Sequence, residues 1–194
     1  MTEADLRSLE NRWRGVGLDA DVLSDAPAPS VDAERPERLL RQCPSAAETP
    51  LVELGGFDAT VWIKDERGRM GLGSFKALGA AYVIASEAEE TGAGELGTAL
   101  SGRTYVTASA GNHGLSVAAG ARIFGARAVV YLAETVPEGF AQRLREKGAE
   151  VVREGAGYEA SMAAAMQAAE KNGWTLLSDS SWAGYFDLAH RLME

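Results

Sequence analysis

The sequence predicts an α/β protein: an open parallel sheet with helices on both faces. From Thr104 onward, short runs rich in β-branched residues alternate with longer helical stretches, and glycines or prolines mark most junctions. Strand-helix alternation of this kind produces parallel strands joined by right-handed crossovers. The chain of 194 residues is 46% hydrophobic and 24% charged, which is typical of a globular protein with a real core.

The N-terminal part is the least regular. We expect a short helix at Leu6–Arg14, a loop at Asp25–Ser30 and a second short helix at Pro36–Gln42, which ends before the next proline. Val61–Lys64 has the β-prone composition of a strand. The stretch that follows, Asp65–Gly73, is charged and rich in glycine, so it is expected to be a loop.

A longer helix is expected from Ser74 to Glu90. Ser74 is a suitable N-cap, several alanines follow at helix-favouring positions, and Gly92 marks the end.

The rest of the chain supplies the alternating elements. The expected strands are Thr104–Ala108, Ala128–Leu132, Glu150–Arg153 and Trp174–Ser178, and the expected helices are His113–Phe124, Pro137–Lys147, Tyr158–Lys171 and Leu188–Glu194. The helix from Pro137 shows the reasoning: proline suits a first turn, Phe140 and Leu144 share one face, and Gly148 ends the helix.

Charge and composition exclude several classes of function. The formal net charge of −9 argues against nucleic acid and anionic membranes as partners, because both require clustered positive charge. No apolar run approaches the length of a membrane span. The acidic N-terminus lacks the layout of a secretion signal, and the single cysteine, Cys43, allows no internal disulfide. We therefore expect a cytoplasmic protein.

Lys76 is the first candidate for a chemical role, because it falls in the first turn of the helix expected from Ser74. The positive end of the helix dipole disfavours another positive charge there. A lysine in such a place suits imine formation with an aldehyde cofactor. A lysine on a helix is more commonly a solvated surface residue, so position alone leaves both interpretations open.

The run Ser109-Ala110-Gly111-Asn112-His113-Gly114 is the second candidate. It follows an expected strand and opens an expected helix, where open parallel sheets bind ligands. Gly111 permits close approach of the backbone, Asn112 offers both a donor and an acceptor, and free amides at the helix start can bind a carboxylate. A plain asparagine-capped helix explains the motif equally well. Together, Lys76 and this turn match the needs of pyridoxal phosphate: an amine for its aldehyde and a polar grip on its ring.

Asp179 ends the last expected strand, on the same ligand-binding edge. A carboxylate there can act as a general base, although capping a turn is its commoner use. His113 and His190 show no spacing typical of metal ligands, and Cys43 adds none, so no metal site is predicted. His113 is expected to line a cleft.

Four stretches resemble the fold-type II pyridoxal-phosphate enzymes, a family that includes threonine and serine dehydratases, cysteine synthases and tryptophan synthase β. These stretches are Thr49-Pro50-Leu51, Trp62-Ile63-Lys64-Asp65-Glu66, Gly73-Ser74-Phe75-Lys76-Ala77-Leu78-Gly79-Ala80 and the turn from Ser109 to Gly114. The charged run before Lys76 and the later segment from Asp179 to Tyr185 are similar to the diaminopropionate ammonia-lyase subgroup.

The resemblance implies a role for each candidate. Lys76 would hold the cofactor covalently as an imine, and Asn112 would bond the 3-hydroxyl of its ring. Ser109 and the amides of the turn Gly111–His113 would take the substrate carboxylate. The implied reaction eliminates the β-substituent of a small amino acid and converts 2,3-diaminopropionate to pyruvate and ammonia. The family also implies a homodimer.

The chain departs from the subgroup at Ala110, where the ammonia-lyase has an aspartate that serves as a base for one substrate enantiomer. An alanine accepts no proton, so the resemblance does not extend to activity on the D-enantiomer. Asp179 matches the carboxylate that acts on the L-enantiomer and is the expected base.

The resemblance also sets expectations for the domains. Residues 1–74 would be the N-terminal part of a larger domain, residues 75–180 the smaller α/β domain, and residues 181–194 the start of the return. The loop that binds the cofactor phosphate and the residue that bonds the pyridine nitrogen would both follow Glu194. We therefore expect a truncated or split enzyme, with an incomplete larger domain and a C-terminal partner chain to complete it.

Three alternatives stay open. A serine/threonine dehydratase-like or β-replacement enzyme is the rival within the catalytic class. A non-catalytic, amino-acid-binding remnant is the second. An unrelated nucleotide-binding domain is disfavoured, because the glycine pattern at Gly92–Gly97 follows an expected helix instead of a strand.

Overall fold

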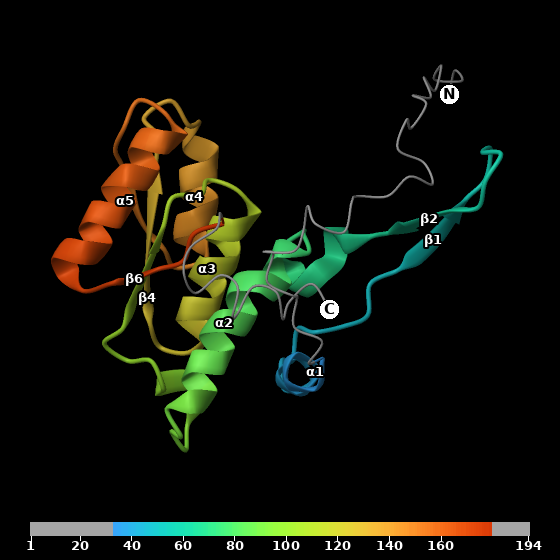
Figure 1. Cartoon of the computed structure of the whole chain (residues 1–194), viewed down its shortest axis with the longest axis horizontal. Coiled ribbons are helices and arrows are strands. Elements are labelled where there is room, and N and C mark those ends of the chain that lie inside the picture. Colours follow the sequence, from blue (N-terminus) through green and yellow to red (C-terminus); the bar gives the residue numbers. More distant parts are fainter. Residues whose placement is uncertain (1–32, 180–194) are drawn as a thin grey trace, which may run out of the picture.

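The computed structural model describes residues 33–179, so the helices expected at Leu6–Arg14 and Leu188–Glu194 lie outside it. A four-stranded parallel sheet forms its centre (Figure 1). Its strands are β3 (Thr104–Thr107), β4 (Arg127–Leu132), β5 (Glu150–Arg153) and β6 (Thr175–Leu176), in the order β5-β4-β3-β6. The predicted α/β class is confirmed.

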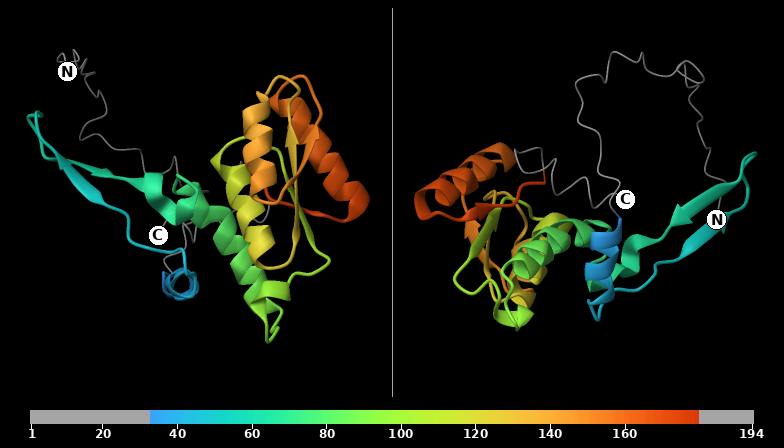
Figure 2. Two further views of the ribbon diagram at one scale, coloured as in Figure 1. Left: turned by 180° about the vertical axis from the view of Figure 1, so that it is seen from behind. Right: turned by 60° about the horizontal axis from the view of Figure 1, so that its bottom comes forward.

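Helices cover both faces of this sheet, as predicted (Figure 2). Helices α3 (Asn112–Ile123) and α4 (Glu138–Glu146) lie on one face, and α5 (Tyr158–Asn172) covers the other. Helix α2 (Lys76–Glu90) packs mainly on α3 and not on the sheet itself. The architecture therefore has α2 as an outer element, held through α3.

The central strand β3 is buried along its whole length. Tyr105 packs with the core on the α3 side, and Val106 packs with the core on the α5 side. Because a parallel strand covered on both faces reads as a continuous run and not as an alternation, composition alone was enough to find it.

The approach of α2 to α3 depends on Gly120. A β-carbon at this position would lie 2.9 Å from Cδ1 of Ile84 and 3.5 Å from Cα of Ala81. The hydroxyl of Ser116 on α3 donates to the carbonyl of Ala77 in the first turn of α2, at 3.3 Å. The start of α2 is therefore fixed against α3.

The order of the strands places a crevice beside β3. The chain moves from β3 to β4 to β5 through α3 and α4, and then α5 returns over the opposite face to set β6 on the other side of β3. Tyr105 pairs with Thr175, and Val106 pairs with Leu176. Connections that leave neighbouring strands toward opposite faces open a ligand crevice at the carboxyl ends. In this chain the crevice is therefore expected between the turn that follows β3 and Asp179, which follows β6.

The N-terminal part holds two elements that the sequence did not predict: strand β1 (Leu51–Leu54), and a 3-10 helix in the stretch Asp65–Gly73 that was expected to be a loop. Strand β1 pairs antiparallel with β2 (Val61–Lys64), and this hairpin projects from the rest of the described structure (Figure 1). Helix α1 (Glu34–Arg41) lies at its base and packs on α2, and a 3-10 helix, η2 (Glu66–Gly71), follows β2. Strand β1 is largely exposed on both faces, so its sequence carries no alternation that would have revealed it.

Several boundaries differ from the expected ones. Helix α1 begins at Glu34, which puts Pro36 in its first turn, where a missing amide hydrogen costs nothing. Helix α2 begins at Lys76 with Phe75 as its N-cap residue, so the prediction of Ser74 as N-cap is wrong; the Ser74 hydroxyl instead accepts the amide hydrogen of Lys76 at 3.2 Å from one position further upstream. Strand β6 has two residues and not the expected five.

Candidate active site

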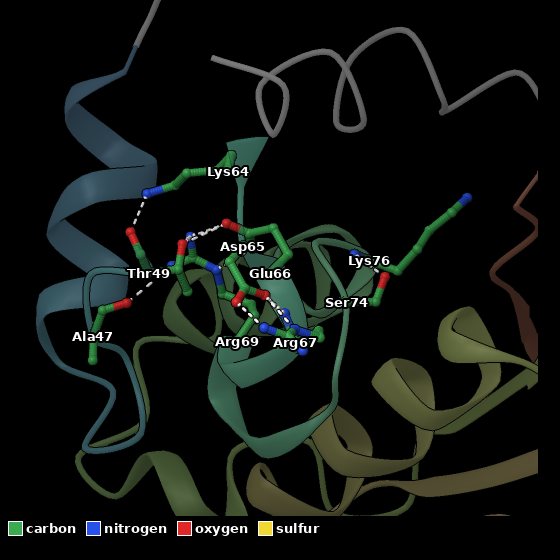
Figure 3. A network of polar contacts seen from close by, with 9 residues as sticks. All are labelled: Ala47, Thr49, Lys64, Asp65, Glu66, Arg67, Arg69, Ser74 and Lys76. Atoms are coloured by element: carbon green, nitrogen blue, oxygen red, sulfur yellow. Dashed lines mark hydrogen bonds and ion pairs between the residues drawn. The ribbon is translucent and has the colours of Figure 1, made fainter. Parts of the chain in front are cut away.

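Lys76 is the first residue of α2 and is half-buried. Its backbone amide is held by the Ser74 hydroxyl, and Ser74 itself is 9% exposed. The Lys76 side chain extends away from the polar network around Glu66 and Arg69 (Figure 3). Within residues 33–179 its amine has no hydrogen bond or ion pair. A fixed backbone thus carries an amine that is free to react.

The turn after β3 presents its polar groups outward. Asn112 opens α3 and is exposed, with Gly111 before it in an extended conformation. The Asn112 amide makes no hydrogen bond within the described part of the chain, so the alternative of a plain asparagine cap does not apply. The first amides of α3 have no acceptor inside the helix. The turn therefore offers donors to a ligand.

Gly114 explains why this turn is so tight. A β-carbon there would lie 2.1 Å from the carbonyl oxygen of Ser109, a contact that no side chain tolerates. The absence of a side chain lets the first turn of α3 rest directly on the Ser109 backbone. The turn motif therefore requires its last glycine for close approach and not for a left-handed conformation.

His113 joins the two sides of the crevice. Its Nε2 lies 2.9 Å from the carbonyl oxygen of Leu177, at the end of β6. Because a carbonyl only accepts, Nε2 must carry the proton. Burial lowers the pKa of His113, the bond to Leu177 and the charge of Asp179 oppose that shift, and the charge of Lys76 adds to it. The imidazole is therefore neutral at pH 7, and Lys76 and Asp179 both lie close enough to act on it.

Asp179 is half-buried and has a partner that the sequence did not reveal. The hydroxyl of Tyr158, the first residue of α5, donates to Oδ1 of Asp179 at 2.9 Å. Burial and this carboxylate raise the pKa of Tyr158 to about 12, so the phenol remains a donor across the physiological range. The available signal was positional: Tyr158 starts a helix at the same edge of the sheet.

A cleft of about 600 Å³ runs from the hairpin to the turn. Ser74, Phe75 and Asn112 line it together with residues of β1 and β2, the stretch from Asp65 to Arg67, and Gly73. The structure thus brings the predicted residues together in two ways. The charges of Lys76 and Asp179 both act on the imidazole of His113, and Asn112 shares a cleft with the residues just before Lys76. Ser109 and Gly111 precede Asn112 in the same turn.

The sequence predicts neither a metal site nor a membrane span. Among residues 33–179, no cluster of three or more histidine, cysteine, aspartate or glutamate side chains could hold a metal ion. No helix in that range is long and apolar enough to cross a membrane.

Comparison with known proteins identifies the family. The family model of pyridoxal-phosphate dependent enzymes matches residues 43–194. The chain belongs to this family. It is 30% identical over 172 residues to diaminopropionate ammonia-lyase of Salmonella typhimurium, a match that covers 79% of this chain and 43% of that protein. The chain therefore spans less than half the length of this relative.

Two further similarities place the chain within the family. The crystal structure of holo diaminopropionate ammonia-lyase from Escherichia coli matches with a TM-score of 0.72 and 27% identity, covering 83% of this chain and 45% of that one. L-threonine ammonia-lyase of Geobacter sulfurreducens is 36% identical over 101 residues, which cover 52% of this chain and 23% of that protein.

The site's residues fit pyridoxal phosphate. The amine of Lys76 and the amide of Asn112 have no polar partner among the described residues, and the imidazole of His113, on which the charges of Lys76 and Asp179 act, is uncharged. An amine that is not paired with a carboxylate suits an aldehyde, and a free amide suits a ring oxygen. Lys76 and Asn112 are thus the residues that would hold the cofactor.

We predict that protonation of His113 destabilises the fold. Its pKa in the folded state lies below the ordinary value of 6.5, so below that pH the unfolded chain binds a proton that the folded chain does not. The free energy of unfolding, measured with urea, should therefore fall as the pH drops below 6.5, and His113→Gln should reduce this slope. An unchanged slope in His113→Gln, or loss of the slope in His190→Gln instead, would contradict the assignment.

Proposed function

We propose that the chain is the N-terminal part of a pyridoxal-phosphate-dependent lyase that acts on 2,3-diaminopropionate and releases pyruvate and ammonia. The observation that carries this proposal is the crevice between β3 and β6. The neutral imidazole of His113 there bonds the carbonyl of Leu177, two residues before Asp179, and the charges of Lys76 and Asp179 both act on it. The similarity to diaminopropionate ammonia-lyases supports the choice of substrate.

The residues of the turn have binding roles in this proposal. The Lys76 amine attaches the cofactor, and the Asn112 amide bonds an oxygen on its ring. Ser109 and the first amides of α3 receive the substrate carboxylate, because a helix N-terminus combines free N–H groups with a favourable dipole. When bound, the cofactor supplies an electron sink for the pair of electrons that the departing α-proton leaves behind.

Asp179 is the proposed base. Its carboxylate can accept the α-proton of the L-enantiomer, and the bond from Tyr158 fixes one of its oxygens and leaves the other available. Ala110 occupies the place where the subgroup has a second carboxylate, and it can accept no proton. We therefore propose that the reaction is confined to the L-enantiomer.

The exposed apolar side chains of the hairpin favour a further polypeptide that covers them. Leu51 and Trp62 are 60% and 53% exposed, and Phe75 beside the cleft is 58% exposed. An isolated two-stranded hairpin is marginally stable, and exposed apolar side chains of this size usually meet another surface. Since the curated relatives are more than twice as long, we propose that polypeptide corresponding to their C-terminal part covers these side chains.

Two accompanying expectations remain predictions. The homodimer rests on the family resemblance alone. The cytoplasmic location is supported by the use of a single cysteine, which permits no internal disulfide.

A threonine or serine dehydratase is the second candidate function. The similarity to L-threonine ammonia-lyase favours it, as does Ala110, because dehydratases commonly have alanine there. Both candidates need Lys76 and Asn112, so the substrate and not the cofactor distinguishes them.

The cofactor assignment predicts a site-specific adduct. Incubation of the purified chain with pyridoxal phosphate, followed by borohydride reduction, should modify Lys76 stoichiometrically, because its amine is unpaired beside the Asn112 turn. Mass spectrometry locates the adduct, and Lys76→Ala is the control. Labelling scattered over several lysines, or none at all, would mean that the described part does not form the site.

The assignment of the base predicts the effect of Asp179→Asn. In an enzyme completed with the C-terminal polypeptide, this change should lower kcat for L-diaminopropionate by about 100-fold or more, because the amide cannot accept the α-proton. Release of pyruvate measures the rate, and Tyr158→Phe should show a smaller loss. Full activity of Asp179→Asn would exclude this carboxylate as the base, and turnover of threonine in place of diaminopropionate would favour the dehydratase.

A further inference from the structure

Upstream of the site lies an ion pair that is largely shielded from solvent. Arg69 donates from Nε to Oε2 of Glu66 at 2.6 Å and from Nη2 to Oε1 at 2.7 Å. The two side chains are only 13% and 17% exposed. This two-point contact fixes the orientation of both groups, which a single contact would not do.

The pair belongs to a network that joins three segments of the chain (Figure 3). The hydroxyl of Thr49 donates to Glu66 at 2.5 Å and accepts from Arg69 at 2.8 Å. Arg69 also donates to the carbonyl of Ala47 at 3.0 Å, and Lys64 donates to the carbonyl of Thr49 at 2.5 Å. The network therefore ties the segment before β1 to the end of β2 and to η2.

The anchored Arg69 begins the turn that leads to Lys76. Its carbonyl accepts the amide hydrogen of Leu72 at 2.9 Å. Met70 follows with a φ of 50°, the only positive φ outside glycine among residues 33–179, and Gly71 and Gly73 have φ values of 66° and 81°. A left-handed methionine is strained, and such strain persists only where the surroundings hold it.

The other end of this turn is fixed by different contacts. The hydroxyl of Ser74 accepts from the amide of Lys76, and the carbonyl of Ser74 accepts from the amide of Ala77 at 3.1 Å. Ser116 on α3 then bonds the carbonyl of Ala77. The strained turn is thus held by the network at one end and by α3 at the other.

The charges of the network are stable across the physiological range. The bonds from Arg69 lower the pKa of Glu66 to about 2, against the opposing effect of burial. The neighbouring pair provides a contrast: Arg67 bonds Asp65 alone among the described residues, and the Arg67 side chain is 89% exposed. Two adjacent arginine pairs therefore differ in burial and in their links to the rest of the chain.

We propose that Thr49, Glu66 and Arg69 are positioning residues for Lys76, which they orient through the strained turn from Arg69 to Gly73. Glu66 lines the cleft, but none of the three has a hydrogen bond to Lys76, Asn112 or Asp179 among the described residues. The inference rests on the proposed function only in giving Lys76 a chemical role, because the network itself is a feature of the described chain.

Arg69→Lys tests this proposal, because it keeps the charge and loses the two-point contact. The matched control is Arg67→Lys. Hydrogen exchange of the purified chain should become about tenfold faster at the amides of Leu72, Lys76 and Ala77 in Arg69→Lys, since local opening no longer has to break the network. Exchange in β3 and β4 should stay unchanged, and Arg67→Lys should exchange like the original chain.

Two further variants and a second measurement sharpen the test. Thr49→Val should give the same local effect, and adding it to Arg69→Lys should have little further effect, because both changes disable one network. The fraction of Lys76 modified by pyridoxal phosphate and borohydride, relative to Lys147 and Lys171, should fall in Arg69→Lys and not in Arg67→Lys.

Each outcome decides one claim. Unchanged exchange at Leu72, Lys76 and Ala77 in Arg69→Lys overturns the proposal, and so does an equal acceleration throughout the sheet, which would show a general effect on stability. A localised acceleration with no loss of Lys76 modification also overturns it. If the original chain forms no Lys76 adduct but the acceleration is localised, the described part does not form the cofactor site by itself, while the network still orders the start of α2.

Discussion

The candidate site depends on the pairing of β6 with β3. Strand β6 has two residues, so the backbone contributes little to holding it. The bond from the amide of Leu177 to the carbonyl of Val106 extends the pairing, and His113 then closes it by donating to Leu177. Because His113 belongs to the turn after β3, one buried imidazole joins the two segments that carry the proposed binding and catalytic groups. Burial lowers the pKa of His113 and keeps the imidazole neutral, and a neutral imidazole with its proton on Nε2 can donate to the Leu177 carbonyl.

Close backbone approach is the second constraint. Gly114 lets α3 begin directly on the carbonyl of Ser109, and Gly120 lets α2 lie against α3. The first glycine shapes the turn that holds Asn112, and the second brings the start of α2, with Lys76, to the same edge of the sheet. The two glycines thus set the distance between Asn112 and Lys76, which have no direct contact with each other.

The sequence predicted the local structure around the candidate residues where short motifs encode it. Lys76 at a helix start and the Ser109–Gly114 turn could be found because strand, turn and helix signals coincide there. The buried strands β3 and β4 could be found because a parallel strand covered on both faces is a run of β-prone residues and not an alternation of apolar and polar ones. The fold class followed from the same alternation.

The features that were missed depend on tertiary placement. Tyr158 reaches Asp179 only because α5 returns across the sheet, and no local pattern shows this. Strand β1 lies in an exposed hairpin. Because neither of its faces is buried, its sequence shows no alternation of apolar and polar residues. The last strand was expected from Trp174, but its ring lies against the guanidinium of Arg127 at 5.8 Å, and pairing starts one residue later.

Mapping of pyridoxal phosphate onto the chain by NMR tests the central claim most directly. If the crevice between β3 and β6 is one cofactor site, the amide shifts that change on titration should cluster at Lys76, at residues 109–113 and at residues 177–179. The groove between α5 and the edge of β6, lined by Met166 and Trp174, is the internal reference and should not respond. Changes confined to that groove, or a response at Lys76 without one at Asn112 and Asp179, would contradict the account.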